Sequence, residues 1–468
     1  MTACNGTLSI TQKHYSQLKQ ILFPGDNLEA VAFALCTRRQ GENSVGFLVK
    51  EIIPVPCKLC QRAYDNVTWR TDIIPPILEH AANKNLSVVK IHSHPNGYES
   101  FSQTDDKSDK DFFGYIHAWL DDDLPHASLI MFPNGDMLGR FSFNCSHFIP
   151  LSSIKMVGDD LKFWFYKSWN PLIDGYGVRV AQTFGEGTYR ALKRLKIGVV
   201  GCSGTGSIVI EQLARNCIGS LVLVDPDRIE LKNLNRIIQA TMEDAQQKRF
   251  KVDIIARHIE AMGFGTKVQP FPKDIYNHDI VSALAECDVL FGCMDSVDGR
   301  HLLNKLATTY LIPYFDIGVK LVADGNGGVE KVCGTVHYLQ PGGSSLFSRG
   351  LYTYDQLRAA SMKHSDPDSY EDQLDAGYIQ GVVEEKPAVI SVNMLIACLG
   401  VNELLARIHP FRDDPNSEYA IHTIGLNGGF LSHEKDGNPC DILKTWVGRG
   451  DVKPLLGIPS LSVQESPN

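Results

Sequence analysis

Two histidines and a carboxylate in the N-terminal third of the chain have the spacing of a metal site. His92 and His94 stand at positions i and i+2 at the end of a strand expected over residues 86–92, so their side chains point to the same side. Asp105 follows after ten intervening residues, from a loop or helix that can complete the set. Three protein ligands and a water are the arrangement of catalytic zinc, not of structural zinc. The residues therefore predict a zinc site that makes hydroxide available for attack on an amide.

Such a site also needs a group that moves protons and a donor for the developing negative charge. Glu29 stands upstream, near the start of an apolar stretch, and is the candidate to accept the proton of the water and pass it to the leaving amine. Glu42 and Glu51 compete with it. Glu51 lies on the strand expected over residues 45–55, however, and Glu42 has the surroundings of a loop residue. Ser102, just before the third ligand, can donate to the oxyanion.

The complete string is more specific than its parts. His-Ser-His-Pro, six residues and then Ser-x-x-Asp resemble the signature of the JAMM (MPN-plus) family, with Glu29 at the matching upstream place. The resemblance covers roughly residues 10–145. It implies that the three ligands bind zinc, that Glu29 is the acid and base, and that Ser102 is the oxyanion donor. It also implies cleavage of isopeptide or peptide bonds after the C-terminus of ubiquitin-like proteins.

A glycine-rich turn in the second half of the chain has the character of a nucleotide site. The turn contains Gly201, Gly204 and Gly206, follows a strand expected over residues 197–200, and opens a helix. Glycines there let the backbone approach phosphates, and the helix N-terminus favours negative charge. Asp225 ends the next strand, the usual place of a carboxylate that binds ribose hydroxyls. By themselves these residues also fit a nicotinamide or flavin dehydrogenase.

The residues after the turn distinguish between these cofactors. Further along the chain come, in order, Asp227, the run from Asn233 to Arg236, Lys251 and Asp295. This ordered set resembles the ThiF, MoeB and ubiquitin-activating family, in which the matching pattern is Asp-x-Asp, Asn-Leu-x-Arg, a lysine and Cys-Thr-Asp-Asn. The resemblance runs over about residues 179–407. It implies a Rossmann-like domain that uses ATP and Mg²⁺ to adenylate a carboxylate.

The chemistry of adenylation accounts for these residue types. The carboxylate attacks the α-phosphate of ATP and pyrophosphate leaves, so the negative charge of the phosphates must be neutralised. Arg236 and Lys251 are expected on the phosphates, and Asp295 on magnesium. Asp225 is expected to bind ribose, and Asn233 to contact the phosphates or the acyl group.

The resemblance implies two more residues of the nucleotide site. Asp227 completes the Asp-x-Asp pattern beside Asp225 and is expected at the cofactor. Arg179 resembles the family's N-terminal arginine, which is often contributed across a dimer. A homodimer through this domain is therefore expected.

A zinc knuckle found in many relatives is not expected here. Those relatives carry a Cys-x-x-Cys pair after a Pro-Gly, whereas this chain has Ser345 and Ser348 at the corresponding places. Only Cys440 stands where the second half of the knuckle should lie. Serine is a poor zinc ligand, so no zinc is expected in this domain.

The catalytic cysteine of ubiquitin-activating relatives also has no clear counterpart. The expected crossover loop contains Tyr378 and no cysteine. Cys333 is expected in a strand, and Cys398 in an apolar core helix. The sequence therefore predicts adenylation, leaves thioester formation open, and suggests transfer of the acyl group to a thiol of a conjugating enzyme.

Length and pattern predict an α/β protein with more than one domain, since 468 residues exceed one ordinary core. Residues 1–150 are expected to form the JAMM-type mixed α/β domain, and residues 151–195 a packed connector with the start of the next domain. Strand, turn and helix alternate from residue 196 and predict a parallel sheet, so residues 196–455 are expected to form the adenylation domain. Residues 456–468 are expected to be a C-terminal tail. Further strands are expected over residues 221–224, 268–270, 288–291 and 313–315.

The composition argues against two classes of partner. The net charge of −9 argues against a nucleic-acid binder held by a basic surface. No apolar run approaches the roughly 20 residues that span a bilayer, and there is no apolar signal core, so no membrane partner and a cytoplasmic location are expected. The twelve cysteines, including Cys57 and Cys60 in a Cys-x-x-Cys, are scattered, which favours reduced thiols.

Together the two resemblances predict a bifunctional enzyme similar to those of bacterial ubiquitin-like conjugation cassettes, some of which are associated with defence against phage. Its zinc isopeptidase would mature or deconjugate a ubiquitin-like protein, whose C-terminus the second domain would adenylate. Two alternatives remain. One is activation of a sulfur-carrier protein or small peptide for metabolite synthesis, with trimming by the JAMM domain. The other is a non-enzymatic scaffold, against which the intact residue sets argue.

Overall fold

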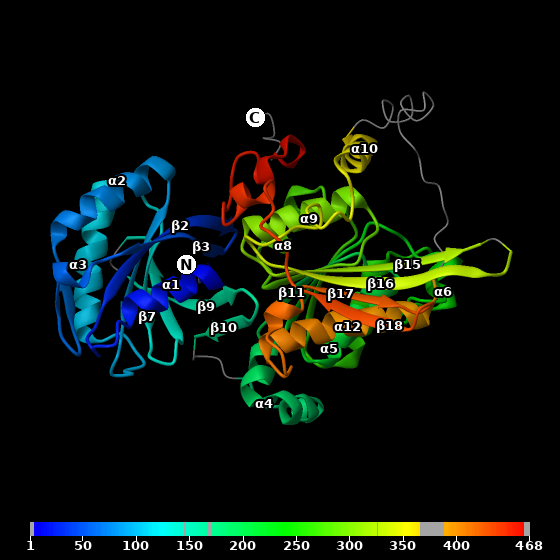
Figure 1. Ribbon diagram of the computed structural model, residues 1–468, viewed down its shortest axis with the longest axis horizontal. Helices are drawn as coiled ribbons and strands as arrows, with labels where there is room; N and C mark the ends of the chain where they lie inside the picture. The colour runs from blue at the N-terminus through cyan, green and yellow to red at the C-terminus, as the bar shows by residue number, and fades with distance from the viewer. Residues whose placement is uncertain (1–3, 145–146, 167–170, 325, 366–387, 463–468) are drawn as a thin grey trace. The chain divides into compact units, whose positions relative to one another are not determined.

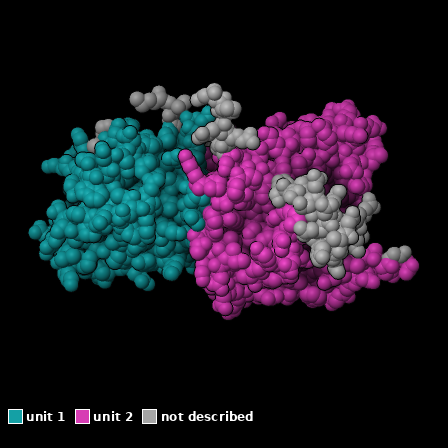
Figure 2. All heavy atoms as spheres, turned by 90° about the horizontal axis from the view of Figure 1, so that it is seen from above, with its two compact units in different colours: residues 1–170, 309–311, 447–452 teal, residues 171–308, 312–446, 453–468 magenta. Residues whose placement is uncertain are grey.

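The computed structural model describes residues 4–144, 147–166, 171–324, 326–365 and 388–462 (Figure 1). It divides into two compact units, shown in different colours in Figure 2. The first unit comprises residues 1–170, 309–311 and 447–452, and the second unit comprises the rest.

The first unit is built on one eight-stranded sheet of order β1-β3-β2-β6-β7-β8-β9-β10. Because β1 also pairs with β9, the sheet closes on itself. A separate hairpin, β4–β5, lies outside this sheet. The strands are β1 (Asn5–Thr11), β2 (Val31–Gly41), β3 (Ser44–Pro54), β4 (Cys60–Arg62), β5 (Val67–Trp69), β6 (Ser87–Ser93), β7 (His126–Met131), β8 (Met137–Ser142), β9 (Ile149–Val157) and β10 (Leu161–Phe165). The helices are α1 (Gln12–Leu22), α2 (Ile74–Lys84) and α3 (Gln103–Leu120), with 3-10 turns η1 (Cys57–Leu59) and η2 (Thr71–Ile73).

Strand β2 is buried on both faces, which explains its continuous apolar sequence. Successive side chains of a strand point to opposite faces. Ala32 and its alternate neighbours accordingly join a core that includes α1, whereas Phe33 and its alternate neighbours join a core with α2 and α3. The first unit therefore has apolar layers on both sides of β2, and the start of this strand is fixed firmly in place.

The second unit contains an eight-stranded sheet of order β13-β12-β11-β14-β15-β16-β17-β18. Pairing is parallel from β13 to β15 and antiparallel from β15 to β18. Figure 1 shows α8 and α9 on one face of this sheet and α5 and α12 on the other. The strands are β11 (Lys196–Val200), β12 (Ser220–Val224), β13 (Lys267–Phe271), β14 (Val289–Gly292), β15 (Tyr314–Ala323), β16 (Val329–Leu339), β17 (Ile421–Gly425) and β18 (Phe430–Glu434).

The helices of the second unit follow the strand-turn-helix alternation in its parallel half. They are α4 (Val178–Leu192), α5 (Gly204–Arg215), α6 (Met242–Gln246), α7 (Lys251–Met262), α8 (His278–Ala285), α9 (Val297–Thr309), α10 (Tyr354–Ser365) and α12 (Ile390–Ile408). The 3-10 turns are η3 (Gly175–Gly177), η4 (Leu231–Asn233), η5 (Asn416–Glu418), η6 (Leu443–Trp446), η7 (Leu455–Gly457) and η8 (Pro459–Leu461). Each strand expected over residues 197–315 is present, and the α/β fold class is confirmed.

The expected connector over residues 151–195 is partly wrong. Residues 151–165 contribute to β9 and β10, which complete the sheet of the first unit. The reason is the parallel pairing of β9 with β1, about 145 residues earlier in the chain, which no local pattern shows. The helix α4 then accounts for most of the remaining residues.

The expected tail over residues 456–468 also needs correction. Its described part contains most of η7 and all of η8. Leu456 and Leu461 are both fully buried. Burial of these leucines stabilises a segment whose proline and glycine content suggests a tail.

Among the described residues, one helix is long and apolar enough to cross a membrane, judged by length and composition alone. It is α12, with a mean hydropathy of 1.4, and 61% of it is buried within the structure. It packs against α5 and against β15 and β16. These contacts are those of a core helix.

Helix α12 also carries a buried carboxylate with three cationic partners. Glu403 is fully buried and accepts hydrogen bonds from Arg407 Nε (2.7 Å), Arg412 and His422 Nε2 (2.7 Å). Burial by itself raises the pKa of Glu403, but the hydrogen bonds and positive charges of these partners outweigh it and lower the pKa to about 2. The network ties α12 to the segment that follows it and to β17.

Replacing Glu403 by glutamine should destabilise the protein by about 3–5 kcal/mol near neutral pH, because it leaves buried cations without their counter-charge. The folded-state pKa of Glu403 lies below its unfolded value. Its stabilisation is therefore present above about pH 4.5 and is lost as the pH falls towards about 2. Urea unfolding across this pH range should show the difference between wild type and E403Q shrinking on acidification. A difference that stays constant would contradict the assignment.

Candidate functional site

The two histidines lie at the end of β6, in the middle of the first unit. His92 pairs with Val31 of β2, so β6 brings the histidines beside the residues just before β2. Ser93, the residue between them, accepts a hydrogen bond at Oγ from the backbone N–H of Ala30 (2.9 Å) and donates its own N–H to the Ala30 carbonyl (3.0 Å). This link fixes Glu29, the neighbour of Ala30, beside the metal ligands.

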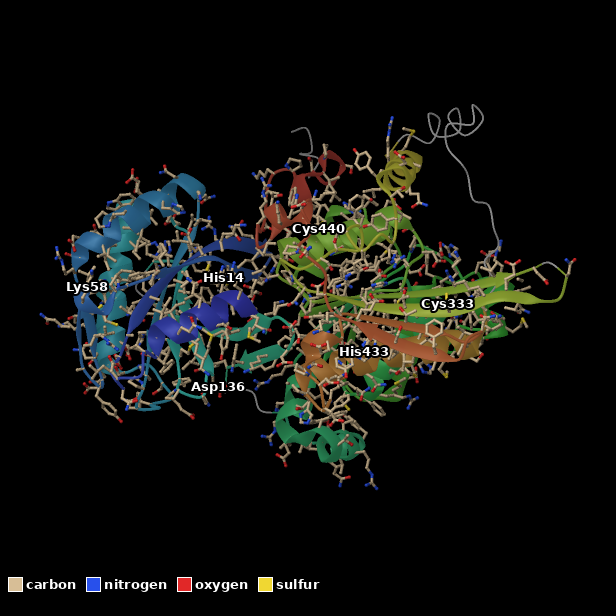
Figure 3. All side chains as sticks on the ribbon, viewed as in Figure 1. His14, Lys58, Asp136, Cys333, His433 and Cys440 are labelled. Atoms are coloured by element: carbon tan, nitrogen blue, oxygen red, sulfur yellow. The ribbon has the colours of Figure 1, made fainter. Side chains whose placement is uncertain are left out.

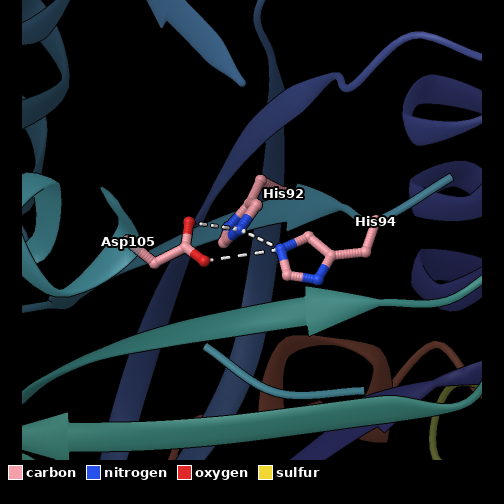
Figure 4. A group of neighbouring side chains, drawn as sticks. All are labelled: His92, His94 and Asp105. Carbon is pink, nitrogen blue, oxygen red and sulfur yellow. Dashed lines mark hydrogen bonds and ion pairs between the residues drawn. The ribbon is translucent and has the colours of Figure 1, made fainter. Parts of the chain in front are cut away.

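The three predicted ligands converge (Figure 4). His92 Nε2 lies 3.1 Å from His94 Nε2 and 3.0 Å from Asp105 Oδ1, and His94 Nε2 lies 3.5 Å from Asp105 Oδ2. The ligand atoms all lie within 4.8 Å of one another. Both histidines are buried, and Asp105 is partly buried.

These distances fit a zinc ion. Two ligand atoms bound to a tetrahedral zinc at about 2.0–2.1 Å lie about 3.3 Å apart, close to the separations found here. Hydrogen bonding also sets the tautomer of His94. Its Nδ1 donates to the Tyr98 carbonyl (2.7 Å), which leaves the lone pair of Nε2 facing the other ligands. Two imidazole nitrogens and a carboxylate oxygen are a donor set that zinc favours.

The charges of the three ligands depend on one another. Burial raises the pKa of Asp105, but His92 and His94, when they are protonated and no metal is bound, outweigh it through their hydrogen bonds and charge and hold the pKa well below its usual range. Burial lowers the pKa of His92. At neutral pH the cluster therefore offers an ionised carboxylate, as zinc binding requires.

Glu29, and not its competitors, faces this cluster. Its Oε1 lies 3.9 Å from His94 Nε2, and its side chain is 5% exposed. Burial raises the pKa of Glu29 to about 7, in the range suited to a general base. Glu51 instead lies beside His80 (3.3 Å) with half of its side chain exposed, and Glu42 is exposed in the turn between β2 and β3.

The backbone of Glu29 is held by residues that the sequence analysis missed. Its N–H donates to the Ala63 carbonyl (2.8 Å), and its carbonyl accepts from Arg62 Nε (2.7 Å). The Arg62 guanidinium also binds the Leu28 carbonyl (2.9 Å) and pairs with Asp26 (2.6 Å). Arg62 thus links the β4–β5 hairpin to the segment of the candidate base. Only the three-dimensional pairing shows this role, because nothing local in the sequence marks it.

Ser102 has a different principal contact from the one expected. It is the N-cap of α3, where Oγ accepts from the Asp105 N–H (3.1 Å) and donates to Asp105 Oδ2 (2.7 Å). In this structure its hydroxyl therefore orients a ligand, and its action on an oxyanion stays a prediction.

A pocket opens beside the cluster. One wall comes from the β4–β5 hairpin, and the other from β6 and the first turns of α3. The pocket is lined by Glu29, Asp65, Asn66, Val67, Trp69, Lys90, His92, Thr104, Asp105 and Ser108. Carboxylates outnumber cations in this lining, which suits an amine leaving group that gains a proton.

In the second unit, the glycine-rich turn joins β11 to α5 as expected, and α5 begins at Gly204. Gly201 has a φ of +90°, and a Cβ there would lie 2.6 Å from the Cys293 carbonyl oxygen. A Cβ on Gly206 would collide with the carbonyl oxygen of Gly201. Close backbone approach therefore requires glycine at both positions.

Two carboxylates and a lysine lie next to this turn. Asp225 follows β12 and accepts from the N–H groups of Cys202 (2.7 Å) and Asp227 (2.9 Å). Burial raises the pKa of Asp225. Lys251 Nζ, at the start of α7, lies 2.7 Å from Asp227 Oδ2 and 3.9 Å from Asp225 Oδ1. The structure thus brings together the predicted ribose and phosphate residues.

The remaining predicted residues are positioned in different ways. Arg236 lies over the turn, since a Cβ on Gly204 would lie 2.9 Å from its Cδ. Asn233 is buried and uses its side-chain oxygen to accept from the Glu230 N–H (3.0 Å), so it also stabilises η4. Asp295 is exposed between β14 and α9. All three roles at the nucleotide remain predictions.

Among the contacts of the described residues, none joins Arg179 to the glycine-rich turn. It lies on α4, and its guanidinium donates to Gln182 of the same helix (3.0 Å). Its proposed action across a dimer stays a prediction.

The serines at the expected knuckle position bond to each other. Ser345 N–H donates to Ser348 Oγ (2.8 Å), and the Cys440 N–H donates to the nearby Gly343 carbonyl (3.0 Å). Hydrogen bonds connect the two parts of the chain that a knuckle would join. Figure 3 labels Cys440 and Cys333, of which Cys333 lies on β16 as expected. Cys398 lies on α12, and Tyr378 lies outside the described residues.

Both regions match known families. Residues 176–434, more than half of the chain, match the ThiF family, and residues 11–137 match the family of prokaryotic homologs of the JAB domain. The chain therefore belongs to the ThiF family and carries a JAB-type domain in its N-terminal part. Both identifications agree with the resemblances found in the motifs.

Individual relatives are distant. The ubiquitin-like modifier-activating enzyme 5 of Drosophila willistoni is 24% identical over 172 residues, 34% of this chain and 40% of that protein. The enzyme of the same name from Bombyx mori is 25% identical over 171 residues, 34% of this chain and 41% of that protein. The chain thus spans about two fifths of the length of these relatives. A crystal structure of E. coli MccB with ATP is 18% identical with a TM-score of 0.43, covering 58% of this chain and 75% of that chain.

Replacing Gly206 by alanine should destabilise the protein by about 1–3 kcal/mol, because the added Cβ meets the Gly201 carbonyl. Gly187 of α4 has no atom near its added Cβ, so G187A is the matched control and should be neutral or slightly stabilising. The midpoints of thermal unfolding of G206A, G187A and the wild type measure these changes in stability. Equal effects of the two substitutions would show that the turn tolerates a side chain.

Proposed function

We propose that this chain is a bifunctional enzyme of a prokaryotic ubiquitin-like system. Its JAB-type domain is a zinc-dependent peptidase or isopeptidase that processes or deconjugates a ubiquitin-like protein. Its ThiF-type domain uses ATP and Mg²⁺ to adenylate the C-terminal carboxylate of that protein. The convergence of His92, His94 and Asp105 beside a buried Glu29 carries the first half. Membership of the ThiF family, together with relatives named as ubiquitin-like modifier-activating enzymes, supports the second.

In the first reaction, His92, His94 and Asp105 would hold zinc, which would supply a Lewis acid and lower the pKa of a water. Glu29 accepts a proton at its carboxylate from the water that bonds to the carbonyl carbon, and delivers it to the amine nitrogen as the C–N bond breaks. Arg62 keeps the backbone of Glu29 in place, and the carboxylates of the pocket favour an amine that becomes cationic. Ser102 orients Asp105 and is the candidate donor to the oxyanion.

In the second reaction, the glycine turn and the N-terminus of α5 receive phosphates of ATP, and Asp225 binds the ribose. Lys251 and Arg236 neutralise the phosphates, and Asp295 would hold Mg²⁺. The carboxylate oxygen of the ubiquitin-like protein forms a bond to the α-phosphorus as the bond to pyrophosphate breaks. Lys251 must leave Asp227 to reach a phosphate, an exchange of one anionic partner for another.

The proposed setting follows the same reasoning. The partners are a ubiquitin-like protein and a conjugating enzyme, with a homodimer formed through the ThiF-type domain and Arg179 contributed across it. The proposed location is the cytoplasm. Activation of a sulfur-carrier protein would be recognised by exchange activity with such a carrier in place of a ubiquitin-like protein.

Zinc analysis tests the first half. The wild-type protein should bind one zinc ion in its JAB-type domain, and D105A should lose it. E29Q should retain zinc but cleave a linear or isopeptide fusion about 10²–10⁴ times more slowly, because the general base is lost. E51Q is the control, since Glu51 faces His80 and not the cluster, and it should cleave at the wild-type rate. Unchanged cleavage by E29Q would remove Glu29 from the reaction.

ATP–pyrophosphate exchange tests the second half. Exchange that depends on a ubiquitin-like protein with a free C-terminal glycine should be abolished in D295A. A non-reducing gel of the same reaction then shows whether the acyl group reaches a cysteine of this chain. Exchange in wild type that persists in D295A would place the magnesium ligand elsewhere, and no exchange with any such protein would contradict the proposed activation.

A further inference from the structure

A buried network of charges lies one helical turn from the candidate zinc ligands, and neither the motif nor the proposed reaction uses it. Its centre is Asp109 of α3, which is fully buried. The Asp109 carboxylate pairs with Lys90 of β6 and with Arg140 of β8, whose Nε and Nη2 lie 3.0 and 2.6 Å from Oδ2. The side chains of Lys90 and Arg140 are 3% and 11% exposed.

The network connects the two elements that supply the ligands. Asp109 stands four residues after Asp105, on the same side of α3. Lys90 stands two residues before His92, on the same face of β6. Each ion pair with Asp109 therefore fixes the first turns of α3, and with them Asp105, against the sheet that carries the histidines.

The sheet register aligns the two cations. Lys90 pairs with Ser128 of β7, and Ser128 pairs with Arg140 of β8, so the three side chains form one row across three strands. Asp109 contacts both ends of this row. A carboxylate held from two strands cannot shift along the helix axis without breaking an ion pair.

Arg140 also contacts the first turn of α3 and the loop that precedes this helix. Its Nη1 lies 2.5 Å from Asp106, the residue next to the ligand Asp105. Its guanidinium also lies 3.8 Å from the centroid of the Phe101 ring and 4.6 Å from that of Phe148. Phe101 belongs to the loop between His94 and Ser102, with its ring 6.5 Å from that of His92. The guanidinium thus contacts the segment joining the second ligand to the third.

Stability alone does not explain such a network, because burying charged groups has a high free-energy cost. Taking three charged groups out of water carries a large desolvation penalty, and well-packed apolar side chains often stabilise a fold as much or more. Zinc, in contrast, needs ligand atoms held within a few tenths of an ångström. Removing a residue that orients the ligands of a metal typically lowers metal affinity by about 10–100-fold.

We propose that Lys90, Asp109 and Arg140 are positioning residues that hold α3 against β6 and thereby set the separation of Asp105 from the two histidines; this role presupposes the zinc site proposed above. None of the three residues is among the proposed metal ligands or proton carriers. They act through Asp105 and through the loop that carries Phe101.

The test compares zinc affinities, measured by competition with a chromogenic chelator, in the full-length chain. K90M removes one cation but leaves Asp109 paired with Arg140, so it is the milder variant. D109N keeps the shape of the side chain and removes the charge that both cations bind. Each variant should bind zinc more weakly than wild type by about 10–100-fold, with K90M nearer the lower figure and D109N nearer the higher.

R38M is the matched control. Arg38 of β2 is a buried cation that donates to Ser87 Oγ at the opposite end of β6 (3.0 Å) and to Asn85 Oδ1 (2.6 Å). Its loss removes hydrogen bonds from the same sheet without touching α3. R38M should therefore lower the midpoint of thermal unfolding while leaving zinc affinity unchanged.

The outcomes separate this role from the proposed function. Wild-type zinc affinity in K90M and D109N, with a lowered unfolding midpoint, would show a purely structural network and overturn the positioning role while the zinc site stands. Equal loss of affinity in R38M would show that general destabilisation is the cause, with the same consequence. A wild-type protein that takes up no zinc would overturn the positioning role and the zinc site together, whereas pyrophosphate exchange would still report on the ThiF-type domain.

Discussion

The antiparallel pairing of β2 with β6 is the interaction on which the first candidate site depends. It brings Glu29, which precedes one strand, beside His92 and His94, which end the other, across more than 60 residues of chain. Both strands are almost entirely buried, and β2 has apolar layers on both of its faces. The reciprocal hydrogen bonds of Ala30 and Ser93 then lock the register at the point where chemistry is expected. A shift by one residue would turn the histidines to the other face of the sheet.

The second candidate site depends on a different constraint, the close approach of backbone to backbone. Gly201 lies against the carbonyl of Cys293, and Gly206 lies against the carbonyl of Gly201. Absence of side chains there opens the N-terminus of α5. Asp225 and Lys251 lie beside this opening because the strands of a parallel sheet end, and the helices that follow them begin, at the same edge. Local geometry, more than charge, thus defines where a phosphate can lie.

Sequence could predict the parts of both sites that short strings encode. The spacing from His92 to Asp105 and the glycine turn are local, and the structure brings their residues together as expected. Glu29 is predicted from its place upstream of the ligands, near the start of an apolar stretch, and from the matching place in a family motif. Arg62 and the Lys90–Asp109–Arg140 network were missed because their roles arise from pairing between distant elements. A lysine inside the apolar string of β6 was the one local signal, since lysine is almost never fully buried without a partner.

The hydroxyl of Ser102 has one hydrogen and two possible destinations. At present that hydrogen bonds to Asp105 Oδ2, which also accepts from the backbone N–H of Ser102. A Ser102 that turned its hydrogen towards an oxyanion would release one of the two bonds on this oxygen and increase the electron density that Asp105 can share with a metal. Stabilisation of the negative charge on the substrate and strengthening of the metal–carboxylate bond would then occur in a single rotation about one side-chain bond. The first turn of α3 would thus act as a relay between substrate and metal, not only as a support.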